Sequence, residues 1–223
     1  GLELPETPDE LKNVLIAFRD KKGATAPLSL AYSTMQWGFA QLGMVSGAFG
    51  IPSLFSYVDN GTVKYGAYED GYKEYLAYMN DLYKEGLLDK NFMTLDDTTV
   101  TANLINGVSG FVLGSGGSGI GNWMTAGEKT DAKFSLTGVS PLAAKKGEKS
   151  VGGHYDNPIM NGAGVAISSG CKNVELACKF LNYGYTDAGH VYWNFGTEGV
   201  SYTIVNDNPY YKHAFTDKVM KAE

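Results

Sequence analysis

The sequence predicts one α/β domain, in which a mixed central sheet is flanked by helices. Predicted strands and helices alternate along the whole chain, without an internal repeat, a composition break or a linker. The length of 223 residues fits one large or two small domains. With 43% hydrophobic and 19% charged residues the chain can bury a sizeable core, and no apolar run approaches the roughly 18 residues of a membrane span.

The first predicted helix begins at Thr7. There Thr7-Pro8-Asp9-Glu10 supplies a capping hydroxyl, an early proline and a glutamate that can reach back to the cap. Apolar residues at helical spacing follow until Gly23 ends the helix. In residues 56–65 two alternating runs flank Asn60-Gly61, a pair that tolerates positive φ, and this predicts a hairpin.

From Tyr72 to Gly86 apolar residues again keep one face of a helix, and we expect this tyrosine-rich face to pack in the core. The remaining elements follow from the same periodicities. They are strands at 27–32, 109–113, 134–139 and 164–167, and helices at 35–45, 97–106, 174–185 and 188–195.

The charge pattern argues against nucleic acid as a partner. The formal net charge is −6, and Arg19 is the single arginine among the eighteen basic side chains. Arginine is also the usual bidentate partner of carboxylate and phosphate groups. We therefore expect a neutral ligand.

Motifs for catalysis and nucleotide binding fail on inspection. The loop 114–119 matches G-x-G-x-x-G, but no acidic residue closely follows the next predicted strand to hold a ribose. Neither serine of this loop lies in a G-x-S-x-G motif. Asp156 and Glu198 are the best candidates for a glycosidase pair, although sequence alone does not bring them together. We expect no enzymatic activity.

The sequence also lacks a recognisable metal or cofactor site. His154, His190 and His213 are too far apart for a local pair of metal ligands. Cys171 and Cys178 match no metal motif, and their redox state stays open. We therefore expect no metal and no cofactor.

Several short motifs occur in a recognisable order along almost the whole chain. They are TPDEL at 7–11, NGTV at 60–63, LYKEGLLD at 82–89, FVLG at 111–114, GVAIS at 164–168, ELACKFL at 175–181 and NFGTEGVSY at 194–202. In this order they resemble the second, C-terminal lobe of extracellular solute-binding proteins of ABC importers. The resemblance is strongest to the carbohydrate-binding group (family 1), which includes lipoproteins of Gram-positive bacteria.

The resemblance implies that residues 1–223 form one periplasmic-binding-protein-like lobe, with the first lobe absent from this chain. Both termini would then lie near each other on the cleft side, and the first six residues show no signal peptide. It further implies binding of a sugar or oligosaccharide without catalysis, and delivery to ABC permease subunits. The location would be the extracellular face of the membrane, through a lipid anchor outside this chain, or the periplasm. A carbohydrate-active enzyme domain and a free-standing sugar-binding module are the alternatives.

Candidate ligand residues combine flat apolar side chains with planar amides, hydroxyls or carboxylates, as a sugar requires. They are Gln36, Trp37, Ser115, Gly117, Ser118, Trp123, Tyr155, Asp156 and Asn157. Gln36 and Trp37 follow the first strand, where open α/β sheets place ligands. The loop 115–118 offers N–H groups and hydroxyls at a helix start, although it lacks the aromatic residue of many sugar-binding relatives.

Each candidate also has a structural alternative. Trp37 and Trp123 could pack in the core, and the loop 115–118 could be a flexible connection without a ligand. For Trp193, beside Tyr192 and Phe195, core packing is the preferred interpretation.

Overall fold

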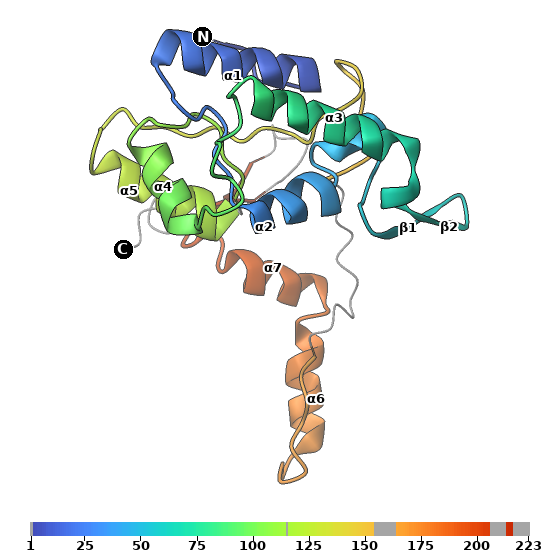
Figure 1. The fold of residues 1–223 in the computed structure, drawn as a ribbon. Helices are drawn as coiled ribbons and strands as arrows, with labels where there is room; N and C mark the ends of the chain where they lie inside the picture. Colours follow the sequence, from blue (N-terminus) through green and yellow to red (C-terminus); the bar gives the residue numbers. More distant parts are fainter. Residues whose placement is uncertain (1, 115, 154–163, 206–212, 216–223) are drawn as a thin grey trace. The chain divides into compact units, whose positions relative to one another are not determined.

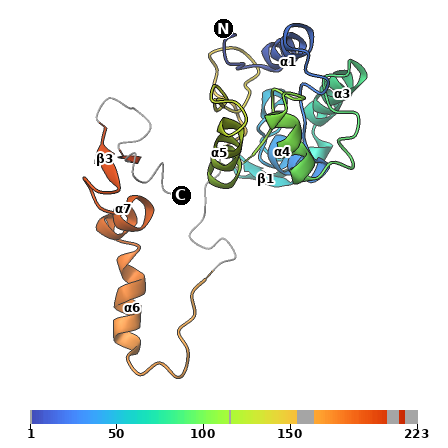
Figure 2. The same ribbon diagram turned by 90° about the vertical axis from the view of Figure 1, so that its left-hand side faces the viewer.

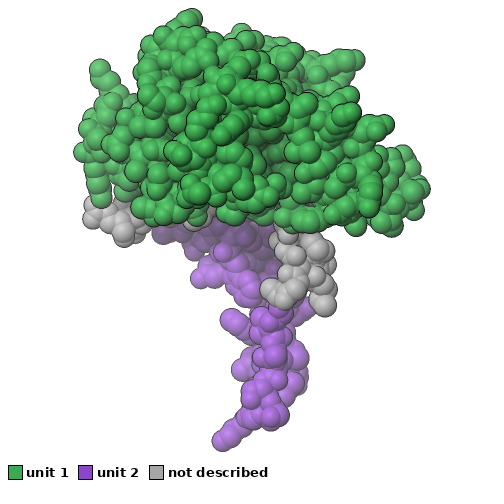
Figure 3. All heavy atoms as spheres, in the orientation of Figure 1, with its two compact units in different colours: residues 1–156 green, residues 157–223 purple. Residues whose placement is uncertain are grey.

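The computed structural model describes residues 2–114, 116–153, 164–205 and 213–215; for 116–118 and 213–215 it describes the backbone alone. The chain divides into two compact units, residues 1–156 and residues 157–223 (Figure 3). Whether residues 1–223 act as one lobe stays a prediction. The predicted closeness of the termini falls on residues outside the described part.

Unit 1 is mainly helical (Figure 1). Its α-helices are α1 (Pro8–Lys22), α2 (Tyr32–Met35), α3 (Asp70–Lys84), α4 (Asp97–Ile105) and α5 (Asn122–Glu128). Two π-helical segments, η1 (Gln36–Gln41) and η4 (Gly116–Gly121), and two 3-10 turns, η2 (Ser46–Phe49) and η3 (Gly66–Tyr68), complete the helical part. The two strands are β1 (Ser56–Asp59) and β2 (Thr62–Tyr65).

Helix α1 forms as its sequence predicts. The Thr7 Oγ1 atom accepts a hydrogen bond from the Glu10 N–H at 3.3 Å. Gly23 ends the helix with φ of 72°, a conformation that glycine adopts without strain. Leu11 and Leu15 lie on the buried face, so the capping signals and the apolar spacing define this element together.

The predicted hairpin is also confirmed. Strands β1 and β2 pair antiparallel from Ser56 opposite Tyr65 to Asp59 opposite Thr62. The turn residues Asn60 and Gly61 have φ of 49° and 79°, as a tight primed turn requires.

The predicted central sheet is present only in reduced form. Leu28 forms parallel bridges to Leu88 on one side and Phe111 on the other. The predicted strands 27–32 and 109–113 therefore each contribute a single bridging position, and the helix α2 begins at Tyr32. Residues 134–139 form no strand, so this prediction is wrong. Strand formation depends on a partner edge that local sequence does not reveal.

The core of unit 1 lies between these bridges and the helices α1 and α3. Its buried residues share contacts in one cluster: Leu11, Leu15, Leu28, Leu30, Met35, Phe39, Ala40, Val45, Ala48, Tyr75, Met79, Leu82, Leu87, Leu88 and Leu142. The apolar face predicted for residues 72–86 supplies Tyr75, Met79 and Leu82, which confirms its core assignment, whereas Tyr72 is half-buried at the margin.

Unit 2 contains the helices α6 (Val174–Tyr183) and α7 (Asp187–Phe195) and the antiparallel strands β3 (Tyr202–Ile204) and β4 (His213–Phe215) (Figure 2). Both helices were predicted. Asn173 and Thr186 cap them through side-chain acceptors, which explains where they begin. Residues 164–167 lie outside any strand, so this strand prediction is wrong.

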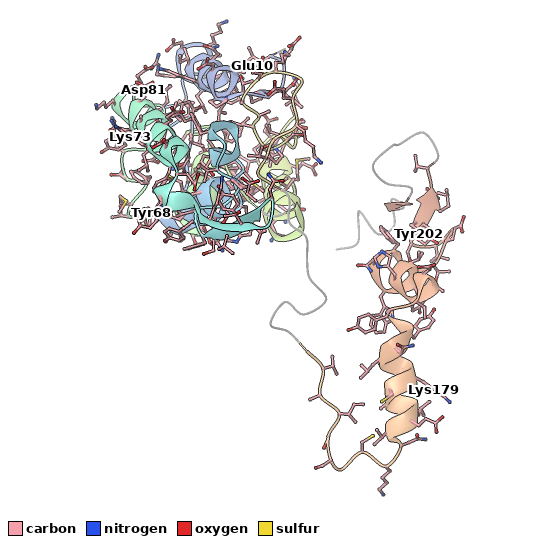
Figure 4. All side chains as sticks on the ribbon, turned by 90° about the vertical axis from the view of Figure 1, so that its right-hand side faces the viewer. Glu10, Tyr68, Lys73, Asp81, Lys179 and Tyr202 are labelled. Carbon is pink, nitrogen blue, oxygen red and sulfur yellow. The ribbon has the colours of Figure 1, made fainter. Side chains whose placement is uncertain are left out.

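Unit 2 exposes many of its large apolar side chains. No residue of α6 is buried, and Phe180 of α6 contacts Trp193 of α7 with 6.0 Å between ring centroids. Trp193 is 52% exposed, so its predicted core position is wrong. Figure 4 shows Tyr202 of β3 beside α7, where its ring lies 6.1 Å from that of Phe195. Within the described residues, no helix has the length and apolar character to cross a membrane.

Candidate ligand-binding site

The chain segments around Leu28, Leu88 and Phe111 run in the same direction, because the bridges between them are parallel. These three segments therefore end at the same edge of unit 1. The Leu28 N–H donates to the Leu87 carbonyl and the Asp89 N–H donates to the Leu28 carbonyl, both at 2.9 Å. On the other side the Ser29 N–H donates to the Phe111 carbonyl at 3.2 Å. Open parallel sheets bind ligands outside the carboxyl ends of their strands. We name this place the carboxyl edge.

A buried polar network fixes the carboxyl edge. Ser29 Oγ donates to Asp89 Oδ2 at 3.1 Å, and Asn103 Nδ2 donates to Ser29 Oγ at 2.9 Å and to Asp89 Oδ2 at 3.3 Å. The Asn91 N–H donates to Asp89 Oδ1 at 2.9 Å. Both oxygens of the Asp89 carboxylate thus accept donors from the protein. The network ties the first two segments to α4 and gives the edge a fixed geometry.

The predicted residues Gln36 and Trp37 lie directly beyond the first of these segments. Helix α2 begins at Tyr32, and Gln36 Nε2 donates to the Tyr32 hydroxyl at 3.3 Å. Trp37 is 45% exposed, whereas Phe39, two residues later, is 2% exposed and belongs to the core. The core alternative for Trp37 is therefore wrong, and its indole is accessible at the carboxyl edge.

Trp123 is held in place by two contacts. Its Nε1–H donates to Thr101 Oγ1 at 2.8 Å, which joins α5 to α4. At Gly114 an added Cβ atom would lie 2.4 Å from Trp123 Cη2, so the ring rests on the glycine backbone. Figures 1 and 2 both show α5 beside α4. Trp123 is half-buried, so its exposure lies between that of a core side chain and that of a cleft side chain, the two alternatives for this residue.

The other predicted residues are described only in part. Gly117 and Ser118 belong to the backbone of η4, which continues into α5, so the second half of the predicted glycine and serine loop is helical. Ser115, Tyr155, Asp156 and Asn157 lie outside the described residues. The role of these positions in ligand binding stays a prediction.

Sequence reasoning missed a row of aromatic side chains near the carboxyl edge, which we call the aromatic row: Tyr32, Tyr65, Tyr68, Tyr72 and Phe92. The Tyr32 ring lies 6.4 Å from Phe92, and Tyr65 lies 5.6 Å from Tyr68. Burial, and then the neighbouring phenols of Tyr32 and Tyr65, raise the pKa of Tyr72, so these three rings are close together. Figure 4 shows Tyr68 at the periphery of unit 1.

The residues of the aromatic row are evident in the sequence, but the sequence analysis assigned them to other elements. Tyr32 was counted as the end of a strand and Tyr72 as part of a core face. Tyr65 is the last residue of the hairpin strand β2, and Tyr68 follows it in η3. Only the fold shows that Tyr32, Tyr65 and Tyr68 are all exposed.

The site offers stacking surfaces and hydrogen-bond groups. Among the described residues, no group of three or more His, Cys, Asp or Glu side chains could hold a metal ion. Glu198 lines a shallow hollow of about 620 Å³ in unit 2, together with Tyr192 and Tyr202. Its proposed glycosidase partner Asp156 lies outside the described residues.

Comparison with known proteins places the chain among binding proteins. The bacterial extracellular solute-binding protein family matches residues 1–191. The fructooligosaccharide ABC transporter substrate-binding protein FusA of Streptococcus pneumoniae serotype 4 is 28% identical over 210 residues, which cover 89% of this chain and 36% of FusA. Lipoprotein LipO of Bacillus subtilis is 27% identical over 127 residues, which cover 52% of this chain and 24% of LipO.

Solved structures agree with these sequence matches. The crystal structure of the alginate-binding protein AlgQ2 without calcium ion is 26% identical, with a TM-score of 0.53 over 97% of this chain and 44% of that one. The structure of a FusA EF-hand mutant in complex with fructo-nystose is 21% identical, with a TM-score of 0.51 over 92% of this chain and 42% of that one. They confirm the predicted α/β, periplasmic-binding-protein-like fold class. The chain spans less than half the length of each of these relatives.

Proposed function

Because this chain belongs to the bacterial extracellular solute-binding protein family, we propose that its carboxyl edge forms one wall of a binding site for a neutral sugar or oligosaccharide. The whole protein would then be the substrate-binding component of an ABC importer. The single observation that carries this proposal is the exposure of Trp37 and Tyr32 at the carboxyl edge, 45% and 42% respectively.

The chemistry of this wall suits a sugar. The C–H face of a sugar ring stacks on flat aromatic side chains, and its hydroxyls need planar amides and hydroxyls. Trp37 and the aromatic row supply the first, and Gln36 with the Tyr32 hydroxyl supplies the second. Because the row continues from Phe92 through Tyr72 to Tyr68, it can contact several rings of a chain. This extent favours an oligosaccharide over a monosaccharide.

The charge of the protein supports a neutral ligand. The net charge is −6, and the single arginine, Arg19, binds Asp20 through its Nε at 2.7 Å. Of the two saccharides in the relatives' names, fructo-oligosaccharide and alginate, only the first is uncharged. We therefore expect a ligand without carboxylate groups.

Binding without turnover fits the polar groups of the carboxyl edge. Both oxygens of Asp89 accept hydrogen bonds from Ser29, Asn103 and the Asn91 N–H, so this buried carboxylate is occupied by protein donors. FusA and AlgQ2 are binding proteins by name. In our proposal the full protein delivers its ligand to ABC permease subunits at the extracellular face of the membrane. A lipid anchor outside these residues, or a periplasmic location, would keep it there.

The proposal is tested by two-dimensional NMR of residues 1–223 titrated with a neutral fructo-oligosaccharide, an alginate oligosaccharide and a tripeptide. We expect the neutral saccharide alone to shift the Trp37 indole signal. A single open wall leaves water around the ligand, so the dissociation constant should be about a millimolar or weaker.

Two variants separate the site from the rest of the surface. Trp37→Ala should remove most of the saccharide-induced shifts of the signals that remain in unit 1. Tyr185→Ala, which truncates an exposed aromatic side chain of unit 2, should leave these shifts unchanged. Equal shifts in both variants would contradict the proposal. Release of free sugar would indicate an enzyme domain, and micromolar affinity of this chain alone would indicate a free-standing binding module.

A further inference from the structure

Asp89 places a carboxylate in the buried part of the carboxyl edge, since this residue is only 7% exposed. Carboxylates are seldom buried without a basic partner, because their removal from water is costly. Among the described residues, no basic side chain forms an ion pair with Asp89. The neighbouring Lys90 donates instead to the Tyr83 carbonyl. What the Asp89 carboxylate stabilises therefore lies in the chain segments that supply its neutral donors.

One oxygen of this carboxylate fixes the turn that follows it. Asp89 Oδ1 accepts the Asn91 N–H at 2.9 Å, and the Phe92 N–H donates to the Asp89 carbonyl at 3.1 Å. An aspartate side chain that bonds the backbone two residues further on stabilises a turn in this way. The Thr94 N–H then donates to the Asn91 carbonyl at 2.8 Å, which closes the turn. The position of Phe92 therefore depends on the Asp89 carboxylate.

The other oxygen anchors the carboxylate to the first chain segment. Asp89 Oδ2 accepts the Ser29 hydroxyl and the Asn103 amide. Ser29 lies three residues before Tyr32, in the segment that leads into α2. The two oxygens of one side chain thus join the segment that leads to Tyr32 with the turn that carries Phe92.

Phe92 contacts two tyrosine rings. Its ring centroid lies 5.8 Å from that of Tyr83 and 6.4 Å from that of Tyr32. Tyr83 and Phe92 are both half-buried and pack against the core cluster, whereas Tyr32 is exposed at the carboxyl edge. Phe92 therefore supports the Tyr32 ring from the side of the core.

We propose that Asp89 is a positioning residue of the saccharide site: it holds Phe92 against Tyr32 and so presents the Tyr32 ring to a sugar, without contacting the ligand itself. This inference rests on the function proposed above. A stacking ring that is fixed before the ligand arrives binds more tightly, because less conformational freedom is lost on binding. A carboxylate suits this task because it accepts hydrogen bonds at both oxygens, whereas an amide has one acceptor oxygen.

The variant Asp89→Asn tests the proposal in residues 1–223, because it keeps the size of the side chain and removes one acceptor oxygen. We expect the aromatic NMR signals of the Tyr32 ring to shift without ligand. The Kd for the neutral fructo-oligosaccharide should rise about 5-fold. Asp96→Asn is the matched control, since the Asp96 carboxylate caps α4 at Thr99, and it should leave both quantities unchanged. A variant Asp89→Asn that lowers the melting temperature with the Tyr32 signals and the Kd unchanged would overturn the proposal.

A double-mutant cycle shows whether Asp89 acts through Phe92. Phe92→Leu keeps an apolar side chain, removes the ring that supports Tyr32 and should also weaken binding. Asp89→Asn should then weaken binding by less than about 2-fold in the Phe92→Leu background, because its route to Tyr32 is already lost. If the two losses multiply in the double variant, Asp89 acts by another route and the proposal fails. Asn103→Ala, which removes donors to Ser29 and Asp89 at a half-buried position, replaces Asp89→Asn in the cycle if that variant does not fold.

The same measurements separate this inference from the proposed function. If no saccharide shifts the signals of the unmodified protein, the proposed function is wrong, and the ligand-free Tyr32 signals alone decide whether Asp89 positions this ring. If the unmodified protein binds and Asp89→Asn binds equally well, Asp89 is not a positioning residue, and the proposed function stands.

Discussion

At the scale of single residues, the structure separates two aromatic side chains that are almost adjacent in sequence. Trp37 and Phe39 both belong to η1, in which the Leu42 N–H bonds the Trp37 carbonyl five residues back. This wider helical turn directs Gly38, Phe39 and Ala40 into the core. The sequence left Trp37 equally open to a cleft position after the first predicted strand and to a core position on its own helix.

This difference predicts opposite effects of truncation. Trp37→Ala should change the free energy of unfolding by less than about 1 kcal/mol, because an exposed side chain contributes little to packing. Phe39→Ala should cost about 3–5 kcal/mol, since it leaves a cavity in the core. Urea unfolding of both variants measures this. A Trp37→Ala variant as unstable as Phe39→Ala would refute the cleft position.

At the scale of elements, helix boundaries and the hairpin were predictable because their signals are local. Thr7 supplies the α1 cap, and Asn60-Gly61 supplies the positive φ angles of the tight turn that joins β1 and β2. The absence of a strand at 134–139 could not be predicted, because strand pairing depends on a partner segment that is remote in sequence. The aromatic row was not predicted for a similar reason, since the exposure of its side chains depends on contacts between segments that are remote in sequence.

The apolar face of α3 makes the stability of unit 1 sensitive to alkaline pH. Burial raises the pKa of Tyr75 well above its usual value. The unfolded chain releases this proton near pH 10, whereas the folded chain retains it, so stability is intact below about pH 10 and falls as pH rises toward the raised pKa. Tyr75→Phe should therefore lose less stability between about pH 8 and pH 11 than the unmodified protein.

Urea unfolding at both pH values measures this effect. Tyr68→Phe, which alters an exposed phenol, is the control and should behave as the unmodified protein does. A Tyr75→Phe variant with the same alkaline loss as the control would show that other groups dominate.

At the scale of the whole molecule, the two units differ in how they are stabilised. The buried cluster runs from Leu11 to Leu142 and lies within unit 1. In unit 2, α6 buries none of its residues and exposes Leu176 and Phe180. Apolar side chains exposed together mark an interaction surface or an aggregation hazard.

Unit 1 should therefore fold without unit 2. A chain ending at residue 156 should melt cooperatively, within about 2 °C of the melting temperature of residues 1–223, because the buried cluster lies entirely within it. Calorimetry of both chains checks this. A loss of many degrees would show that residues 157–223 stabilise unit 1.

The three tryptophans sit in three distinct environments, and this distribution makes the protein suitable as an optical reporter. Trp37 is accessible to solvent, Trp123 is bonded to Thr101, and Trp193 contacts Phe180. Replacing Trp123 and Trp193 by phenylalanine would leave one fluorophore, whose emission wavelength depends on the water around it. Displacement of that water by a ligand would shift the emission to the blue, without any label attached to the protein.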